Sequence, residues 1–106
     1  MSVVHREWWL ATLGRTVVWA QLRVREAGTA EVFDSDGKIL SYDSEDTARA
    51  ALMDAEFVSL QGLDEDDALV RGFSLDEIAP PQDANDEGLP DEILRQRMVQ
   101  QLGARA

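Results

Sequence analysis

The sequence has no cysteine, a single histidine and no long run of apolar residues. Without cysteine the chain forms no disulfide, no zinc–thiolate site and no thiol nucleophile. No apolar stretch approaches the roughly 18 residues that are needed to cross a bilayer, so we expect no membrane contact. The first residues, with Glu7 and Arg15 around a short apolar run, do not have the pattern of a secretory signal peptide. These absences favour a cytoplasmic protein.

Residue types that carry out catalysis are also scarce. His5 is the one imidazole, and we expect it to be solvated at the end of the chain, where residues are poorly held. The seven glycines are scattered singly through predicted turns and form no phosphate-binding loop. The many carboxylates lie in polar runs, whereas a catalytic acid needs a desolvated pocket that shifts its pKa. We therefore predict that the protein is not an enzyme and binds no metal or cofactor.

Positive charge is in the minority. Ten basic residues stand against 21 acidic ones, and the net charge is −11. Residues 1–33 carry +1, residues 34–92 carry −15 and residues 93–106 carry +3. Because duplex nucleic acid is bound largely by neutralising its phosphates with Lys and Arg, the acidic middle segment disfavours duplex DNA and RNA. An acidic surface instead favours a protein partner with a basic surface.

What is present is enough for one small folded domain. With 44% hydrophobic residues, the chain is too apolar to be disordered, and 106 residues can bury one modest core. Nine arginines against one lysine are typical of a GC-rich bacterial genome. We expect a single α+β domain over residues 1–80, an acidic linker over 81–89 and a C-terminal amphipathic helix within 90–106.

The first half of the chain has the pattern of β-strands. Two runs rich in aromatic and β-branched residues are separated by Gly14-Arg15, which suits a two-residue hairpin loop. Glycine-containing turns then separate two shorter runs. The pattern predicts a four-stranded antiparallel β-meander over about residues 7–42. Its strands are expected over 7–13, 16–25, 29–34 and 38–42.

The hydrophobic period then changes to that of a helix. Ser44 is a good N-cap, and small apolar residues recur on one face after it, which predicts a helix over about 45–55 packed on the meander. Short helical turns are expected after Asp64 and after Ser74, where Glu77 completes a capping box.

Leu94, Met98 and Leu102 are spaced at i, i+4 and i+8, which predicts an amphipathic C-terminal helix over about 90–102. Such an apolar stripe packs on its own domain in many proteins. The acidic residues before it and the reversal of charge to +3 equally suit docking into a partner or exchange between two copies. Both interpretations stay open, and with them a homodimer.

Tryptophan is concentrated in the first two strands. The neighbours Trp8 and Trp9 must point to opposite faces of the sheet. One of them joins the core, and the other shares the outer face with Trp19, Arg23 and Arg25. Aromatic and Arg side chains on a sheet face are typical of protein interfaces and of single-strand nucleic-acid platforms. The alternative is a second buried layer, in which the C-terminal segment covers this face.

Three features supply the candidate partner-binding residues: the Trp–Arg face, an acidic run and the C-terminal stripe. They comprise Trp9, Trp19, Arg23, Arg25, Asp64, Glu65, Asp66, Asp67, Leu94, Met98 and Leu102. The leading hypothesis is a small acidic protein-interaction domain without enzymatic activity, a bacterial regulator or adaptor. One alternative is a nucleic-acid mimic that occupies the basic groove of a DNA-binding protein, which requires carboxylates gathered on one surface. Another is a single-strand nucleic-acid binder that uses the Trp–Arg face.

Overall fold

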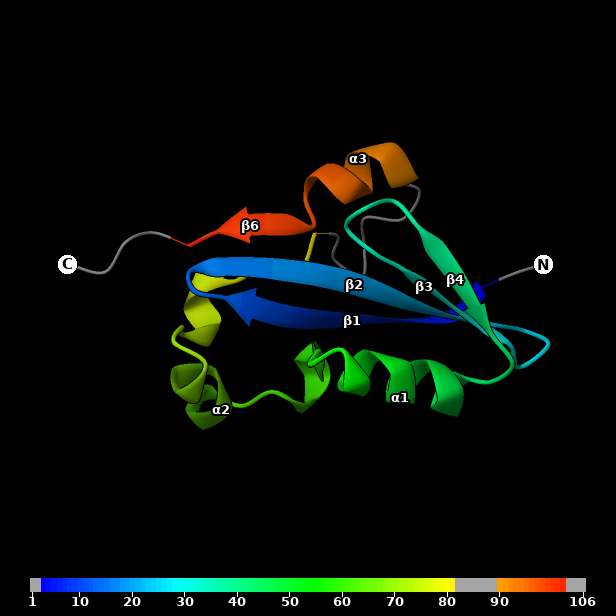
Figure 1. Cartoon of the computed structure of the whole chain (residues 1–106), viewed down its shortest axis with the longest axis horizontal. Helices are drawn as coiled ribbons and strands as arrows, with labels where there is room; N and C mark the ends of the chain where they lie inside the picture. The colour runs from blue at the N-terminus through cyan, green and yellow to red at the C-terminus, as the bar shows by residue number, and fades with distance from the viewer. Residues whose placement is uncertain (1–2, 82–89, 103–106) are drawn as a thin grey trace.

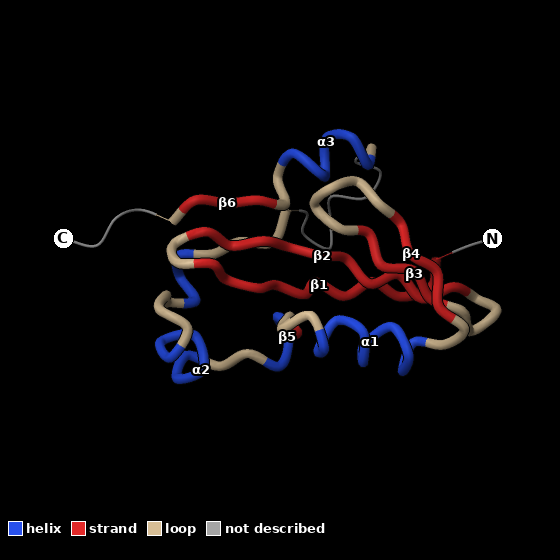
Figure 2. The backbone as a smooth tube through the Cα atoms, viewed as in Figure 1, coloured by secondary structure: helices blue, strands red, loops and turns tan. Residues whose placement is uncertain are grey.

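The computed structural model describes residues 3–81 and 90–102, and it is an α+β domain built on one antiparallel sheet (Figures 1 and 2). The strand order is β4-β3-β2-β1-β5, and a further strand, β6, also pairs with β2. The strands are β1 (Val3–Leu13), β2 (Thr16–Arg25), β3 (Ala30–Phe33), β4 (Ile39–Tyr42), β5 (Val58–Ser59) and β6 (Val99–Gln101).

The sheet contains the predicted meander and extends beyond it. Strands β1 to β4 follow one another as hairpins, although β1 begins at Val3 rather than at Glu7. The sheet has six strands instead of four because β5 adds to β1 and β6 adds to β2. These two strands are two and three residues long, too short for an alternating pattern to be visible in the sequence.

A two-residue loop sets the register of β1 against β2. Leu13 pairs with Thr16 across the loop, and Gly14 has a φ of +60°, which glycine adopts without strain. The following pairs keep this register, so that Leu10 lies opposite Trp19. Because neighbouring side chains on a strand alternate between faces, the loop also decides on which face each tryptophan lies.

Helix α1 (Glu45–Asp54) agrees with the prediction and lies along one face of the sheet (Figure 1). The side chain of its N-cap, Ser44, accepts a hydrogen bond from the backbone N–H of Thr47. The caps expected from Asp64 and Ser74 are also present. The other helical segments are η1 (Leu60–Gly62), α2 (Glu65–Val70), η2 (Leu75–Glu77) and α3 (Asp91–Gln96).

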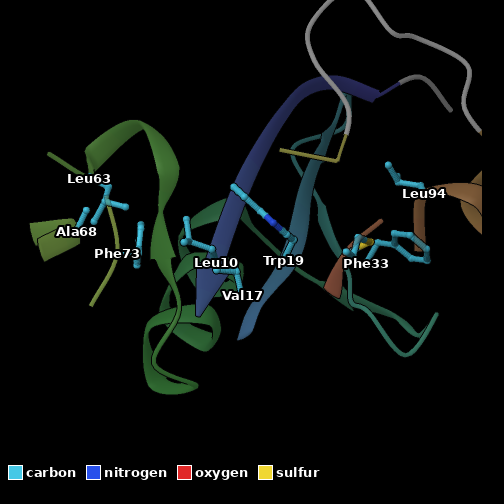
Figure 3. Close-up of a cluster of buried hydrophobic side chains, with 9 residues drawn as sticks. Leu10, Val17, Trp19, Phe33, Leu63, Ala68, Phe73 and Leu94 are labelled. Carbon is cyan, nitrogen blue, oxygen red and sulfur yellow. The ribbon is translucent and has the colours of Figure 1, made fainter. Parts of the chain in front are cut away.

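The central strands β1, β2 and β3 have a buried core on each face. On one face, β1, β2 and β3 pack against α1 and form the α1 core. Its buried members are Trp9, Ala20, Leu22, Val24, Ala30, Val32, Ala48 and Leu52. The second core brings the sheet together with the segments around α2 and α3 (Figure 3). Its buried members are Leu10, Val17, Trp19, Phe33, Leu63, Ala68, Phe73, Leu94 and Met98.

The C-terminal helix predicted over 90–102 is too long. α3 ends at Gln96, and β6 follows it, antiparallel to the first residues of β2. The backbone N–H of Trp19 donates to the carbonyl oxygen of Met98 at 2.7 Å just before β6 begins. β3 leaves this stretch of β2 without a partner, and pairing with β6 satisfies its backbone groups. Strand pairing has here outweighed a helical spacing of apolar residues.

An acidic linker is predicted over 81–89. Pro81 is described, but the rest of this segment, residues 82–89, lies outside the described residues. The division into a domain over 1–80 and a separate segment over 90–106 therefore stays a prediction. None of the helices in the described ranges is long and apolar enough to span a membrane.

Candidate functional site

The tryptophans pack into the two cores rather than forming an exposed face. Trp9 lies under α1, whereas Trp8 and Trp19 share the opposite face with their rings edge to face, 6.0 Å between centroids. Trp19 is 0% exposed. Trp8, not Trp9, is its neighbour because the hairpin register places Leu10 opposite Trp19. Of the two arrangements considered for this face, the structure has the second buried layer, in which the C-terminal segment helps to cover Trp19.

The two arginines expected beside Trp19 are paired within the chain. Arg23 Nη2 donates to Asp91 Oδ1 at 2.8 Å, and its guanidinium carbon lies 4.8 Å from the centre of the Phe33 ring. Arg25 forms an ion pair with Glu31 on the neighbouring strand β3. Arg23 thus connects β2 to the first turn of α3, and neither guanidinium lies beside an exposed tryptophan ring.

The C-terminal stripe packs on the chain's own sheet. Leu94 and Met98 are fully buried in the second core, and Leu102 is half-buried against it. Figure 3 shows Leu94 and Phe33 on the same side of Trp19. The stripe therefore contributes to the fold of its own domain, while a homodimer stays a prediction.

The acidic run lies exposed at the start of α2. Asp64 Oδ1 accepts from the backbone N–H of Asp67 at 2.8 Å, and Glu65 accepts from the Ser74 hydroxyl at 2.9 Å. The side chains of Asp66 and Asp67 make no hydrogen bond with the other described residues. In the part of the chain that the structure describes, no three His, Cys, Asp or Glu side chains are arranged to hold a metal ion.

A cluster around the buried carboxylate of Glu7 joins β1 to α1, and it was not among the predicted sites. Glu7 is 7% exposed; its carboxylate accepts from Trp9 Nε1 at 3.1 Å and pairs with the Arg49 guanidinium. His5 lies in β1 with its Nε2 2.8 Å from Glu7 Oε2; its side chain is 46% exposed, so it is solvated as expected while also contacting the buried carboxylate. Burial by itself raises the pKa of Glu7, but hydrogen bonds from Arg49, His5 and Trp9 outweigh it and lower the pKa to about 2.

A signal for this cluster exists in the sequence. Strand alternation places Glu7 on the same face as Trp9, which makes it a charged residue on an apolar face. A buried charge requires a partner, and Arg49 projects from the helix that covers this face. The Arg49 contact ties α1 to β1, whereas those of His5 and Trp9 lie within β1, and together they have a structural role.

The surface is hollowed where α1 ends, and this feature was not predicted either. A groove of about 650 Å³ lies between the tip of the β1–β2 hairpin and the C-terminal end of α1. Leu13 and Val18 line it from the hairpin, Met53 and Phe57 from the end of α1, and Arg71 from the end of α2. We call it the hairpin groove. A smaller hollow of about 260 Å³ shares Met53, Phe57 and Arg71 with it and therefore adjoins it.

The hairpin groove combines apolar walls with a negative rim. Leu13 is 75% exposed and Met53 is 59% exposed, on opposite banks of the groove. α1 has no basic residue in its last turn, so nothing from the helix itself compensates the negative end of its dipole. Glu56 lies on the bank formed by Met53 and the end of α1, and Asp67 lines the adjoining hollow. Arg71 lines both hollows and offsets part of this negative charge.

Glu56 has a backbone conformation that favours glycine. Its φ is +67°, and it is the one non-glycine residue with a positive φ among the described residues. Its N–H donates to the carbonyl of Met53 at 3.0 Å, and the next N–H, of Phe57, donates to the carbonyl of Leu52 at 2.9 Å. These are the bonds of a Schellman motif, in which glycine usually occupies the position of Glu56. A side chain here costs about 1 kcal/mol, and it places a carboxylate at the groove.

Comparison with protein-family models, with curated proteins and with solved structures finds no match for this chain. Function is therefore inferred from the described surfaces and their chemistry.

Proposed function

We propose that the protein is a small acidic protein-interaction domain without enzymatic activity, a bacterial regulator or adaptor whose partner has a basic surface. The observation that carries this proposal is an exposed groove with apolar walls in a strongly acidic chain. The groove supplies area that a partner can desolvate, and the charge supplies a preference among partners.

A basic partner is favoured because opposite charges speed association, and this effect weakens as salt screens them. Residues 34–92 carry a net charge of −15, and they include both helices beside the groove. The carboxylates of Asp66 and Asp67 suit such contacts because they are exposed and make no hydrogen bond with other described residues.

The absence of enzymatic activity is proposed from the groups at the groove. Its titratable side chains are Glu56 and Arg71, and both are exposed. General acid–base catalysis favours a group whose pKa has moved toward neutrality. Glu7, the buried carboxylate among the described residues, instead has its pKa lowered to about 2.

Affinity capture from a bacterial lysate, at low and at high salt, tests the proposal with the immobilised full chain. We expect basic proteins to be retained at low salt and released at high salt. The variant Asp66→Asn/Asp67→Asn should retain less than a control of equal net charge, Glu26→Gln/Asp36→Asn, which removes exposed carboxylates from two turns of the sheet. Retention of no protein at either salt would count against the proposal.

A further inference from the structure

We infer that the hairpin groove binds an extended, basic and amphipathic segment of the partner protein, which adds to the open edge of β1. This inference rests on the proposed function and specifies the surface and the chemistry of the partner segment.

The outer edge of β1 is open beside the groove. β1 is 11 residues long, but β5 pairs only with Trp9 and Leu10. Trp19, opposite Leu10, donates its backbone N–H away from β1, to Met98. In an antiparallel pair such residues direct their backbone groups outward, and the same holds two residues further on, at Thr12. No described strand pairs with Thr12 on that outer edge. An unpaired strand edge is a template for a further strand.

The side chains around this edge favour apolar residues at alternate positions of the bound segment. Ala11 and Leu13 project toward the α1 side of the sheet and line the groove, with Met53 on the opposite bank. A strand added beside Thr12 directs every second side chain to this same face. Apolar residues at those positions cover Leu13 and Met53, two of the most exposed large apolar side chains among the described residues.

The charges around the groove favour basic residues in the bound segment. The C-terminal end of α1, which has no basic residue in its last turn, and the carboxylate of Glu56 lie on the bank that faces the added strand. Together with Asp67 and Arg71, the charged side chains of the two hollows sum to −1. Lys or Arg in the segment complements this rim. A second copy of the chain is disfavoured as the occupant because each copy carries −11.

The probe is a short synthetic peptide in which valine and lysine alternate, and its matched control alternates valine and glutamate. The full chain is titrated with each peptide and followed by the NMR signals of its backbone amides. We expect the lysine peptide to shift the amides of Thr12, Leu13 and Glu56, with an affinity that falls as salt rises. The glutamate peptide should not bind.

Variants then test each part of the groove. Leu13→Asn and Met53→Asn should each weaken binding of the lysine peptide about fivefold or more, as expected for a central apolar contact. Val4→Asn is the matched control, because Val4 is an exposed apolar residue on the same strand outside the groove. Glu56→Gln should weaken binding and flatten its salt dependence. The amide spectrum of each variant also reports whether it is folded.

Several results would overturn the inference. No binding of the lysine peptide, equal binding of both peptides, or amide shifts confined to another surface would each contradict it. So would a bound peptide that is helical. An equal loss of affinity in Val4→Asn and in Leu13→Asn would also contradict it. A dimer of the free chain that Leu13→Asn dissociates would assign the groove to a second copy instead. Lysate capture separates the two proposals. If the unaltered chain and Leu13→Asn capture the same proteins equally, the inference about the hairpin groove is contradicted and the proposed function is not. If the unaltered chain captures no protein, the proposed function is contradicted.

Discussion

At the scale of the residue, two glutamates show how differently a carboxylate is used in this fold. Glu7 is buried and is hydrogen-bonded by His5 and Trp9 within β1 and by Arg49, which holds α1 against β1. Glu56 is exposed at the rim of the hairpin groove and is held in a backbone conformation that destabilises the folded chain. The first residue stabilises the fold through its charge, and the second places its charge on a surface.

The pKa of Glu7 makes stability depend on acidic pH. Hydrogen bonds lower it from 4.5 to about 2 in the folded chain. The unfolded chain therefore takes up a proton first, so the stabilisation is complete above about pH 4.5 and is lost as the pH falls toward 2. We expect Glu7 to account for a loss of about 3 kcal/mol in the free energy of unfolding across this interval. Urea unfolding at a series of pH values measures it.

The matched variants are Glu7→Gln and Glu26→Gln. Glu7→Gln should be less stable at neutral pH, because Arg49 loses its buried counter-charge, and should show a shallower pH dependence between 4.5 and 2. Glu26→Gln changes an exposed turn residue and should keep the original slope. An unchanged slope in Glu7→Gln would contradict the assignment.

Replacing Glu56 with glycine should stabilise the folded chain. Glycine adopts a φ of +67° without a Cβ clash, so we expect Glu56→Gly to raise the free energy of unfolding by about 1 kcal/mol. Asp54→Gly, two residues earlier and within α1, should lower it by a similar amount, because glycine is unfavourable inside a helix. Urea unfolding compares the two variants, and a loss of stability in both would contradict the strain at Glu56.

The same substitution connects stability to the proposed binding. If Glu56 is retained for its carboxylate, Glu56→Gly should bind the lysine peptide more weakly while it unfolds at higher urea concentration. Opposite changes in stability and affinity are common where a strained residue serves a binding surface.

At the scale of the element, β2 has two successive partners on one of its edges. β3 pairs with its second half and β6 with its first residues, so a segment from the end of the chain completes the sheet. The pairing brings Leu94 and Met98 over Trp19 and excludes solvent from that face. The C-terminal segment is therefore an integral part of the second core.

Truncation of Met98 should measure this contribution. Met98 is fully buried, and Met98→Ala should lower the free energy of unfolding by about 3 kcal/mol, through lost burial and the cavity left behind. Val99→Ala is the matched control on the neighbouring, exposed residue and should cost less than about 1 kcal/mol. Tryptophan fluorescence during urea unfolding follows both variants, since Trp19 is in the same core. Equal effects would show that the segment is not packed as described.

At the scale of the whole molecule, the sequence pattern predicted those elements that depend on interactions between residues close in sequence. The meander over 7–42, the helix over 45–55 and the caps at Ser44 and Asp64 depend on residues close in sequence, and the structure contains them. β6 depends on an edge of β2 that is distant in sequence, and its apolar spacing also fits a helix. The hairpin groove depends on where α1 ends relative to the hairpin, which no local pattern contains.

The tryptophan faces were predictable in principle. A two-residue loop at Gly14-Arg15 fixes Leu13 opposite Thr16 and therefore Leu10 opposite Trp19, which places Trp8, rather than Trp9, beside Trp19. The composition of β2 carried a second signal. Residues 16–20, its first half, are apolar or nearly so on both faces, which is the pattern of a strand buried on both sides.

The directions of β1 and β6 have a mechanical consequence. Both strands are antiparallel to β2, and β1 begins at one end of the long axis while β6 finishes at the other (Figure 1). A force that pulls Val3 and Gln101 apart therefore acts along both strands and loads their hydrogen bonds to β2 in shear, all at once rather than one after another. Under such a force we expect β6, which is held by three residue pairs, to slip before β1 does.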